Sequence, residues 1–248
     1  MKIISICNQK GGVGKTTVTY HLGHGLAEKE LKTLLIDLDP QGNLSYALEK
    51  ENACTASEIF SDKPTIKTEP ISDYLDLVSS NVLLAKIESR VDISSYIKLR
   101  QALTNTKNKW NFVLIDSPPS LGTLTLNGLL AADSILIVTL PYHFAIIGLK
   151  DLLDIIENVR EGELNPKISL LGILLNMVSR TTVAKEAITV LERKFGDTIF
   201  YSRIPQTIRL EECLQNKQPI WQYERSNPAS SAYKEFIMEF LQKVTEAR

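Results

Sequence analysis

The segment "NQKGGVGKTT", residues 8–17, follows the short apolar run "IISIC" and contains three glycines and two lysines. Gly11, Gly12 and Gly14 allow the backbone to turn with its amide groups pointing inward. A helix that begins near Lys15 adds the partial positive charge of its N-terminus, so polyanionic phosphate is favoured there. This order of strand, glycine loop and helix predicts a phosphate-binding loop.

The loop departs from the pattern Gly-x-x-x-x-Gly-Lys-Ser/Thr at its first position, where Gln9 stands instead of glycine, and Lys10 adds a second lysine. Within the pattern we expect Lys15 to reach the β- and γ-phosphates, Thr16 to ligate Mg²⁺ and Thr17 to donate to the α-phosphate. The alternative is a glycine-rich turn with a chance lysine. The intact run "GKTT" after a buried strand favours the phosphate loop.

Three aspartates stand where a magnesium nucleotide site needs carboxylates, at the ends of apolar runs. In "LLIDLDPQGN", Asp37 and Asp39 are two residues apart, so their side chains leave the chain on the same side. In "FVLIDSPPS", Asp116 follows four apolar residues. This is the arrangement expected of a Walker B aspartate, which usually holds magnesium through water. Each aspartate alone could merely cap its own loop. Together with one phosphate loop, they predict a shared site at the carboxyl ends of parallel strands.

The elements that must position these residues alternate between apolar runs and segments of helical spacing. The runs expected to form buried strands are 3–7, 33–37, 75–80, 112–116, 134–140 and 170–176. The segments expected to form helices are 15–29, 93–107, 145–160, 182–195 and 228–246. This alternation predicts an α/β fold with a doubly wound, mostly parallel sheet flanked by helices.

No linker rich in Gly, Ser or Pro divides the chain, so we expect one domain over residues 1–248. Residues 49–72, with mixed polarity and two prolines, are interpreted as a surface excursion. The last helix is expected to begin with Asn227 as its cap and Pro228 as its first residue. Its apolar face should dock on the core and comprises Tyr233, Phe236, Ile237, Phe240 and Leu241.

Composition narrows the class of protein. The 28 Lys and Arg residues are balanced by 29 Asp and Glu residues, and this net charge of -1 excludes a globally basic nucleic-acid binder. Three widely spaced cysteines suggest neither a disulfide framework nor a thiolate metal cluster, which fits a reducing cytoplasm. His21 and His24 are expected to be packing or surface residues rather than metal ligands. We expect no membrane span, because no apolar run approaches the roughly 20 residues needed.

The motifs "KGGVGKTT", "LLIDLDPQGN" and "FVLIDSPPSLG", in this order, resemble the ParA branch of the ParA/MinD ATPases, P-loop NTPases with a deviant Walker A motif. The segments "RIPQTIRLEE" and "ERSNPASSAY" extend the resemblance over the whole chain. It implies an ATP-bound sandwich dimer in which Lys10 reaches the nucleotide phosphates of the partner subunit. It also implies that Asp39 orients the attacking water, while Asp37 and Asp116 serve Mg²⁺ through its waters.

The catalytic residues are therefore expected to be Lys10, Lys15 and Asp39. For the base, the resemblance points to Asn176, which ends the run "LLGILLN", and to Pro205 in "RIPQ". An asparagine at this place can also act as a plain strand-end cap. The residues expected to bind ATP are Gly11, Gly12, Val13, Gly14, Lys15, Thr16, Thr17, Asn176 and Pro205.

A DNA-binding surface is expected in the last third of the chain. Residues 180–225 contain eight Lys or Arg against six Asp or Glu, a bias too small to form a basic stripe. The resemblance implies non-specific contact with double-stranded DNA through Arg225, with Arg203 and Arg209 as secondary candidates. Lys194 is added on charge alone. Dimerisation would double these weak phosphate contacts and make them strongly salt dependent.

The leading interpretation is a cytoplasmic, nucleoid-associated ATPase that partitions a plasmid or chromosome, with hydrolysis stimulated by a ParB-type partner. One rival is a MinD-like membrane ATPase, disfavoured because "LQKVTEAR" is not a basic amphipathic tail. A second rival is an ATP-dependent amido-ligase or carboxylase of the same fold. A third is a nucleotide-gated scaffold with vestigial hydrolysis. It is disfavoured because Asp39, which is expected to orient the attacking water, is present.

Overall fold

The computed structural model describes residues 1–88, 93–106, 109–142 and 145–246. Its centre is one sheet with the strand order β3-β4-β2-β5-β1-β6-β7-β8, parallel throughout except for β3 against β4. The strands are β1 (Lys2–Cys7), β2 (Thr33–Asp37), β3 (Glu69–Ser72), β4 (Leu75–Val78), β5 (Phe112–Asp116), β6 (Ser134–Thr139), β7 (Ser169–Val178) and β8 (Ile199–Pro205).

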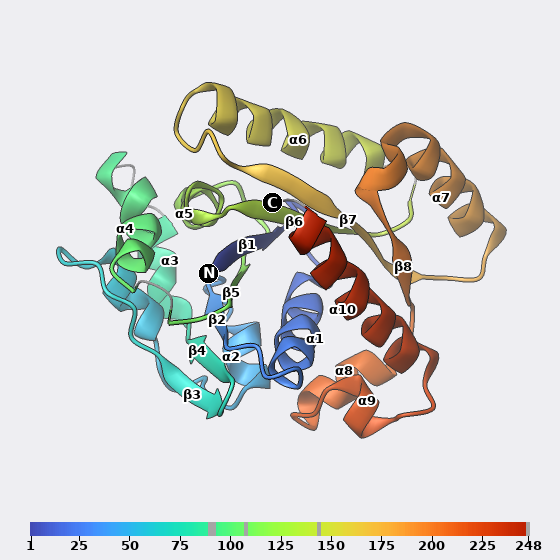
Figure 1. Cartoon of the computed structure of the whole chain (residues 1–248), viewed down its shortest axis with the longest axis horizontal. Coiled ribbons are helices and arrows are strands. Elements are labelled where there is room, and N and C mark those ends of the chain that lie inside the picture. Colours follow the sequence, from blue (N-terminus) through green and yellow to red (C-terminus); the bar gives the residue numbers. More distant parts are fainter. Residues whose placement is uncertain (89–92, 107–108, 143–144, 247–248) are drawn as a thin grey trace.

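Helices cover both faces of this sheet. The α-helices are α1 (Lys15–Ala27), α2 (Asn43–Ala47), α3 (Ala85–Glu88), α4 (Lys98–Thr104), α5 (Thr123–Ala131), α6 (Ala145–Glu161), α7 (Thr182–Phe195), α8 (Arg209–Gln215), α9 (Ile220–Tyr223) and α10 (Pro228–Glu246). Short 3-10 helices are η1 (Thr55–Phe60), η2 (Val82–Leu84), η3 (Ile93–Ile97) and η4 (Gly196–Thr198). Figure 1 shows α1 and α10 along one face of the sheet and α5 and α6 along the other.

Alternation along the strands divides the core into two faces. In β1, Ile4 and Ile6 pack in the cluster that contains α1 and α10, whereas Cys7 packs with α5 and α6 on the opposite face. The third cluster joins β2, β4 and β5 to α4 and η1. The doubly wound α/β fold expected from the sequence is confirmed.

All six expected strands and the expected helices are present, with ends shifted by a few residues. The segment 93–107 begins as a 3-10 helix and becomes helical only at Lys98, and its last residue lies outside the described residues. Asn227 caps α10, because its Oδ1 accepts the backbone N–H of Ala229 at 3.0 Å. The docked face of α10 is also as expected, with Tyr233 and Phe240 fully buried.

The interpretation of residues 49–72 as a surface excursion is wrong for part of the segment. Ala56 and Ile59 of η1 are fully buried against β2 and β4. Glu69–Ser72 forms the antiparallel edge strand β3. The segment packs because η1 brings its apolar residues to one side, a pattern too short to stand out in a mixed stretch. Within the described residues, no helix is long and apolar enough to cross a membrane.

Candidate nucleotide-binding site

The three adjacent strands β2, β5 and β1 bring the chemical groups of the site together. Asp37 at the end of β2 pairs in register with Asp116 at the end of β5, and Asp116 pairs with Ile6 of β1. The phosphate loop, residues 8–14, leaves β1 directly beyond this point. The strand ends thus place two carboxylates beside the glycine loop, as the sequence predicted.

The backbone of the loop requires glycine at Gly14. Its φ of 88° lies in the left-handed region, and a Cβ there would lie 2.2 Å from Nδ2 of Asn176. That Nδ2 donates to the carbonyl oxygen of Val13 at 2.8 Å. The tip of β7 therefore braces the loop at the point where α1 begins.

Lys15 lies over its own loop. Its Nζ donates to the carbonyl oxygens of Asn8 at 3.1 Å and of Lys10 at 3.3 Å. Burial lowers the pKa of Lys15, and the charges of Asp116 and Asp39 act in the opposite direction. The ammonium group is thus held inside the loop, where phosphate oxygens could replace the two carbonyls.

Thr16 and Asp116 provide the oxygen atoms that a magnesium ion needs. The Thr16 hydroxyl donates to Oδ2 of Asp116 at 2.7 Å, and Thr19 donates to Oδ1 at 3.4 Å. Burial and the charge of Asp37 raise the pKa of the Asp116 carboxyl. In the part of the chain that the structure describes, no three His, Cys, Asp or Glu side chains could together hold a metal ion. The few protein oxygens present suit Mg²⁺, which keeps several waters and uses substrate phosphates as ligands.

Asp37 holds the loop that carries Asp39. The carboxylate of Asp37 accepts the backbone N–H of Asp39 at 3.0 Å, the N–H of Ser45 at 2.9 Å and the Ser45 hydroxyl at 2.7 Å. Asp39 is only 8% exposed, and its Oδ1 accepts the N–H of Gln41 at 2.9 Å. The sequence-based role of Asp37 toward Mg²⁺ stays a prediction, while its contacts give it a second role in shaping this loop.

Asn176 lies two residues before the end of β7, and Pro205 ends the neighbouring strand β8. Oδ1 of Asn176 is buried and has no hydrogen-bond partner among the described residues, so it could accept from a bound base. A pocket of about 400 Å³ lies just beyond Asn176, where Pro205 forms part of the wall. The other residues that line it are Val178, Ser179, Arg180, Gln206, Thr207, Asn227 and Pro228. The expected base site stays a prediction, with a pocket at the expected place.

Lys10 and Gln9 lie at the outer part of the loop. Lys10 is exposed, its backbone N–H donates to Oδ1 of Asn8 at 3.0 Å, and its Cε lies 3.6 Å from where a Cβ on Gly148 of α6 would be. Nε2 of Gln9 is buried without a hydrogen-bond partner in the described part of the chain. Lys10 is thus at the surface beside the start of α6, where a second molecule could meet it.

Two functional candidates were missed by sequence reasoning. The Ser80 hydroxyl donates to the carbonyl oxygen of Asp39 at 2.7 Å, and Glu88 accepts hydrogen bonds from Ser120 and Leu124 in the segment after Asp116. These contacts join residues 32 to 41 positions apart, and no motif in the sequence signals them.

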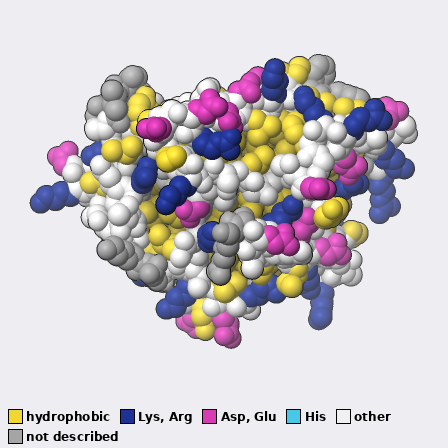
Figure 2. Space-filling model, turned by 45° about the horizontal axis from the view of Figure 1, so that its top comes forward, with side chains coloured by type: hydrophobic (Ala, Val, Ile, Leu, Met, Phe, Trp, Pro, Cys, Tyr) yellow, Lys and Arg dark blue, Asp and Glu magenta, His cyan; other side chains and the backbone are white. Residues whose placement is uncertain are grey.

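The basic residues expected to contact DNA differ in their surroundings. Arg203 pairs with Glu192, and Arg209 contacts Glu212 at 2.5 Å and Glu224 at 3.3 Å. Arg225 and Lys194 are exposed and belong to none of the ion pairs found among the described residues. Figure 2 shows basic and acidic side chains interspersed over the visible face.

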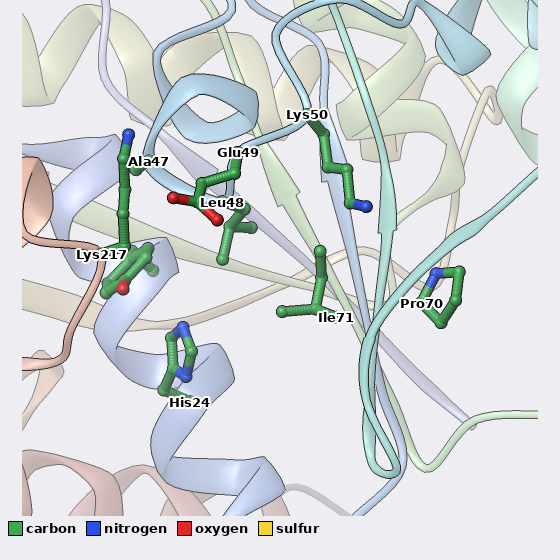
Figure 3. A pocket seen from close by; sticks show the side chains of 9 residues that line it. His24, Ala47, Leu48, Glu49, Lys50, Pro70, Ile71 and Lys217 are labelled. Carbon is green, nitrogen blue, oxygen red and sulfur yellow. The ribbon is translucent and has the colours of Figure 1, made fainter.

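A second pocket, of about 250 Å³, lies along α1 about two helical turns beyond Lys15. Figure 3 shows His24 of α1, Ile71 of β3 and Glu49 after α2 around it. Its lining includes Glu49, Lys50 and Lys217, so its charges are mixed and favour no single class of ligand.

The chain is similar to known proteins over most or nearly all of its length. The family model AAA_31, described as an AAA domain, matches residues 1–170. The chromosome-partitioning ATPase Soj of Treponema pallidum is 36% identical over 246 residues, which cover 97% of each chain. The sporulation initiation inhibitor protein Soj of Bacillus subtilis is 35% identical, covering 96% of this chain and 97% of its own. The chromosome partitioning protein ParA of Myxococcus xanthus is 36% identical, with coverage of 98% and 89%.

Solved structures give the same fold. Cobyrinic acid a,c-diamide synthase from Mycobacterium smegmatis, solved with ADP and magnesium, superposes with a TM-score of 0.84 at 29% identity, covering 100% of this chain and 96% of that chain. The same protein has also been solved with an ATP analogue and magnesium. A plasmid partition protein from Borrelia burgdorferi gives a TM-score of 0.78 at 25% identity and covers 98% of each chain.

Proposed function

The chain belongs to the family of the ParA and Soj partitioning ATPases, and on this premise we propose that it is a DNA-partitioning switch driven by binding and hydrolysis of Mg-ATP. The observation that carries the proposal is the contact of Thr16 with Asp116 beside the glycine loop and the buried Lys15. A cation ligand, a carboxylate and a phosphate-binding ammonium group thus lie at one point.

The nucleotide is held by the loop residues 11–17, with its phosphates at the N-terminus of α1 and its base toward Pro205. Lys15 exchanges its two carbonyl partners for phosphate oxygens, and Thr16 with Asp116 holds the Mg²⁺ shell. A bound Mg²⁺ offsets charge on the phosphate oxygens. The unpartnered Oδ1 of Asn176 and the glycine cradle at Gly14 support this fit.

Hydrolysis depends on Asp39, whose carboxylate accepts a hydrogen bond from the attacking water and orients it toward the γ-phosphate. Lys10 reaches the phosphates of the partner subunit and offsets charge that develops during phosphoryl transfer. ATP and water then give ADP and phosphate. The buried Asp37, which fixes the Asp39 loop through three hydrogen bonds, supports this division of roles.

The ATP-bound form is a homodimer joined across the carboxyl ends of the strands. Large apolar side chains are exposed along this side of the sheet, as expected of a surface that meets a partner. They follow β4, β5 and β6 and include Val82 (72% exposed), Leu121 (37%), Tyr142 (51%) and Ile147 (63%). Lys10 lies next to the start of α6, which carries Ile147.

The dimer binds double-stranded DNA without sequence preference, and Arg225 is the foremost contact because it is exposed and outside the ion pairs described above. Arg203 and Arg209 must exchange glutamate partners for phosphates, and Lys194 adds charge at the end of α7. A ParB-type partner stimulates hydrolysis and releases DNA. The protein then acts in the cytoplasm at the nucleoid, on a plasmid or a chromosome.

The test is an ATP-dependent DNA-retention assay, combined with phosphate release and light scattering. Lys10→Ala should fail to dimerise on ATP, Asp39→Ala should stay dimeric on DNA, and Arg225→Glu should dimerise without retaining DNA. Lys167→Ala, at an exposed position before the amino end of β7 and so away from the carboxyl ends of the strands, is the matched surface control. Equal DNA retention with and without ATP would refute the switch.

A second candidate follows from the likeness to the diamide synthase, namely an ATP-dependent ligase that activates a small carboxylate. The same phosphate-release assay separates the two. Turnover that rises with DNA and partner supports partitioning, whereas turnover that requires a carboxylate and an amide-nitrogen donor supports the ligase.

A further inference from the structure

Ser80, the second residue after β4, is hydrogen-bonded to the loop that carries Asp39. Ser80 is fully buried, its hydroxyl donates to the carbonyl oxygen of Asp39 at 2.7 Å, and its N–H donates to Oγ of Ser45 at 2.8 Å. Its carbonyl oxygen lies 2.8 Å from where a Cβ on Gly42 would be. Ser80 therefore holds this loop through two hydrogen bonds, at Asp39 and at Ser45, and its carbonyl oxygen leaves no room for a side chain at position 42.

The other end of the same segment is fastened to the chain after Asp116. Oε1 of Glu88 accepts the Ser120 hydroxyl at 2.7 Å, and Oε2 accepts the backbone N–H of Leu124 at 2.9 Å. Gly122, the N-cap residue of α5, has no side chain to cap that helix. Glu88 supplies the missing acceptor and places its negative charge at the positive end of α5.

Gly122 leaves the space that this contact needs. A Cβ at Gly122 would lie 1.9 Å from Oε1 of Glu88 and 2.9 Å from Oε2. Any side chain at this position therefore displaces the carboxylate. The contact thus depends on one residue at each side, which allows it to be broken in two independent ways.

The segment between Ser80 and Glu88 is mostly helical and is anchored in the core near its middle. Oδ1 of Asn81 caps η2 by accepting the N–H of Leu83 at 3.0 Å, and Leu84 is fully buried in the core. The remaining residues form α3, which ends at Glu88. Helical turns anchored by a buried leucine transmit a displacement better than an extended loop would.

The segment after Asp116 also lies beside the phosphate loop and the end of β1. Cβ of Pro119 lies 3.7 Å from where a Cβ on Gly11 would be, and the N–H of Ser117 donates to the carbonyl oxygen of Ile6 at 3.3 Å. Movement of residues 117–122 would therefore alter one wall of the phosphate site.

We propose that residues 80–88 form a strap that couples the Asp39 loop to the segment 117–124, and that Glu88 is a positioning residue for ATP hydrolysis. The inference rests on the proposed function and deepens it. Glu88 acts through the two loops. While its hydrogen bonds are intact, the Asp39 carboxylate and the segment 117–124 beside Asp116 keep a fixed position relative to each other. When these hydrogen bonds are broken, each loop relaxes separately.

The first test needs no nucleotide. In the nucleotide-free protein, Glu88→Ala should increase amide hydrogen exchange at residues 120–124, because it removes the acceptor of the Ser120 hydroxyl and of the Leu124 N–H. The strap further requires faster exchange at residues 39–45, on the far side of Ser80. Glu58→Ala on η1 removes an exposed carboxylate in the same layer and should change neither region. Faster exchange confined to residues 120–124 would reduce Glu88 to a local helix cap and overturn the proposal.

The second test measures turnover. Glu88→Ala and Gly122→Ala should each lower kcat by about 10-fold or more while KM for ATP stays within about twofold, because the loops are misplaced but the phosphate loop is intact. The double variant should lose no more than the stronger single variant, since both break one contact. Unchanged kcat in both variants, with an active wild type, would overturn the strap alone. A wild type without Mg-dependent turnover would instead overturn the proposed function.

Discussion

His21 makes the stability of this protein depend on pH in a way that can be calculated. The ring is fully buried; its Nδ1 donates to the carbonyl oxygen of Thr17 at 2.7 Å, and its Nε2 accepts the N–H of Ile220 at 3.1 Å. Both nitrogens are satisfied only in the neutral form, because a proton on Nε2 would face another donor. Burial lowers the pKa of His21 to about 3.

The sign follows from proton counting. An unfolded histidine titrates near a pKa of about 6.5, so below that pH the unfolded chain binds a proton that folded His21 excludes. The contribution of His21 to the free energy of unfolding is therefore fully present well above pH 6.5, and it is lost as the pH decreases through about 6.5 toward 3. At pH 5 the loss from this residue is about 2 kcal/mol relative to pH 7.5. For a chain of this size, that loss lowers the thermal midpoint by about 4–8 °C.

The assay compares urea unfolding of the wild type with His21→Gln at pH 7.5, 6 and 5. Glutamine keeps a donor and an acceptor but does not titrate, so the wild type should lose about 2 kcal/mol more than the variant over this range. Subtracting the two curves removes the contribution of His24, whose pKa burial also lowers, to about 4. Parallel curves for the two proteins would refute the assignment of His21 as a buried neutral ring.

Three further predictions concern the phosphate site and the sheet edge. Gly14→Ala should abolish binding of an ATP analogue in calorimetry, because its Cβ meets Asn176 and its φ is positive. Thr16→Ala should weaken binding of Mg-ATP at least about 10-fold but leave binding of ATP in EDTA within about twofold, since it removes a metal ligand. Glu239→Ala should lower the free energy of unfolding by about 1–3 kcal/mol and promote self-association in light scattering. Glu239 accepts the backbone N–H groups of Tyr201 at 2.8 Å and of Ser202 at 2.9 Å, both in the edge strand β8.

Each of these predictions has a matched comparison. Gly196→Ala also places a side chain at positive φ, but in open space remote from the phosphate loop, and should retain nucleotide binding. For the metal, equal losses with and without EDTA would show that Thr16 contributes to the fold rather than to Mg²⁺. For the edge, Glu235→Ala on an exposed part of α10 should stay monomeric in the absence of ATP.

Most of the fold could be predicted because its strands are buried on both faces and so form unbroken apolar runs. The strand β8 was missed because "IFYSRIP" lies at the sheet edge and alternates buried with exposed residues, Tyr201 being 80% exposed. The helix α5 was missed for the opposite reason: nearly all of "TLTLNGLLA" is buried, so no polar face marks the helical period.

The residues of the candidate site also differ in how far the sequence could predict them. Lys15, Thr16 and Asp116 could be predicted because a local motif or a strand end fixes each of them. Ser80 and Glu88 could not, because their partners become neighbours only after the sheet has assembled. Asp37 lies between these cases: its position was foreseen, but its three hydrogen bonds to the following loop depend on a turn that spacing alone does not define.

The brace from Asn176 to Val13 has a consequence for dividing the chain. The family match ends at residue 170, six positions before the amide that steadies the phosphate loop. A fragment cut at that boundary keeps every residue of the nucleotide motif and loses the support under it. Transplanting the motif to another scaffold would therefore require a strand that delivers a donor to the same carbonyl, because the loop's shape is held from outside the motif.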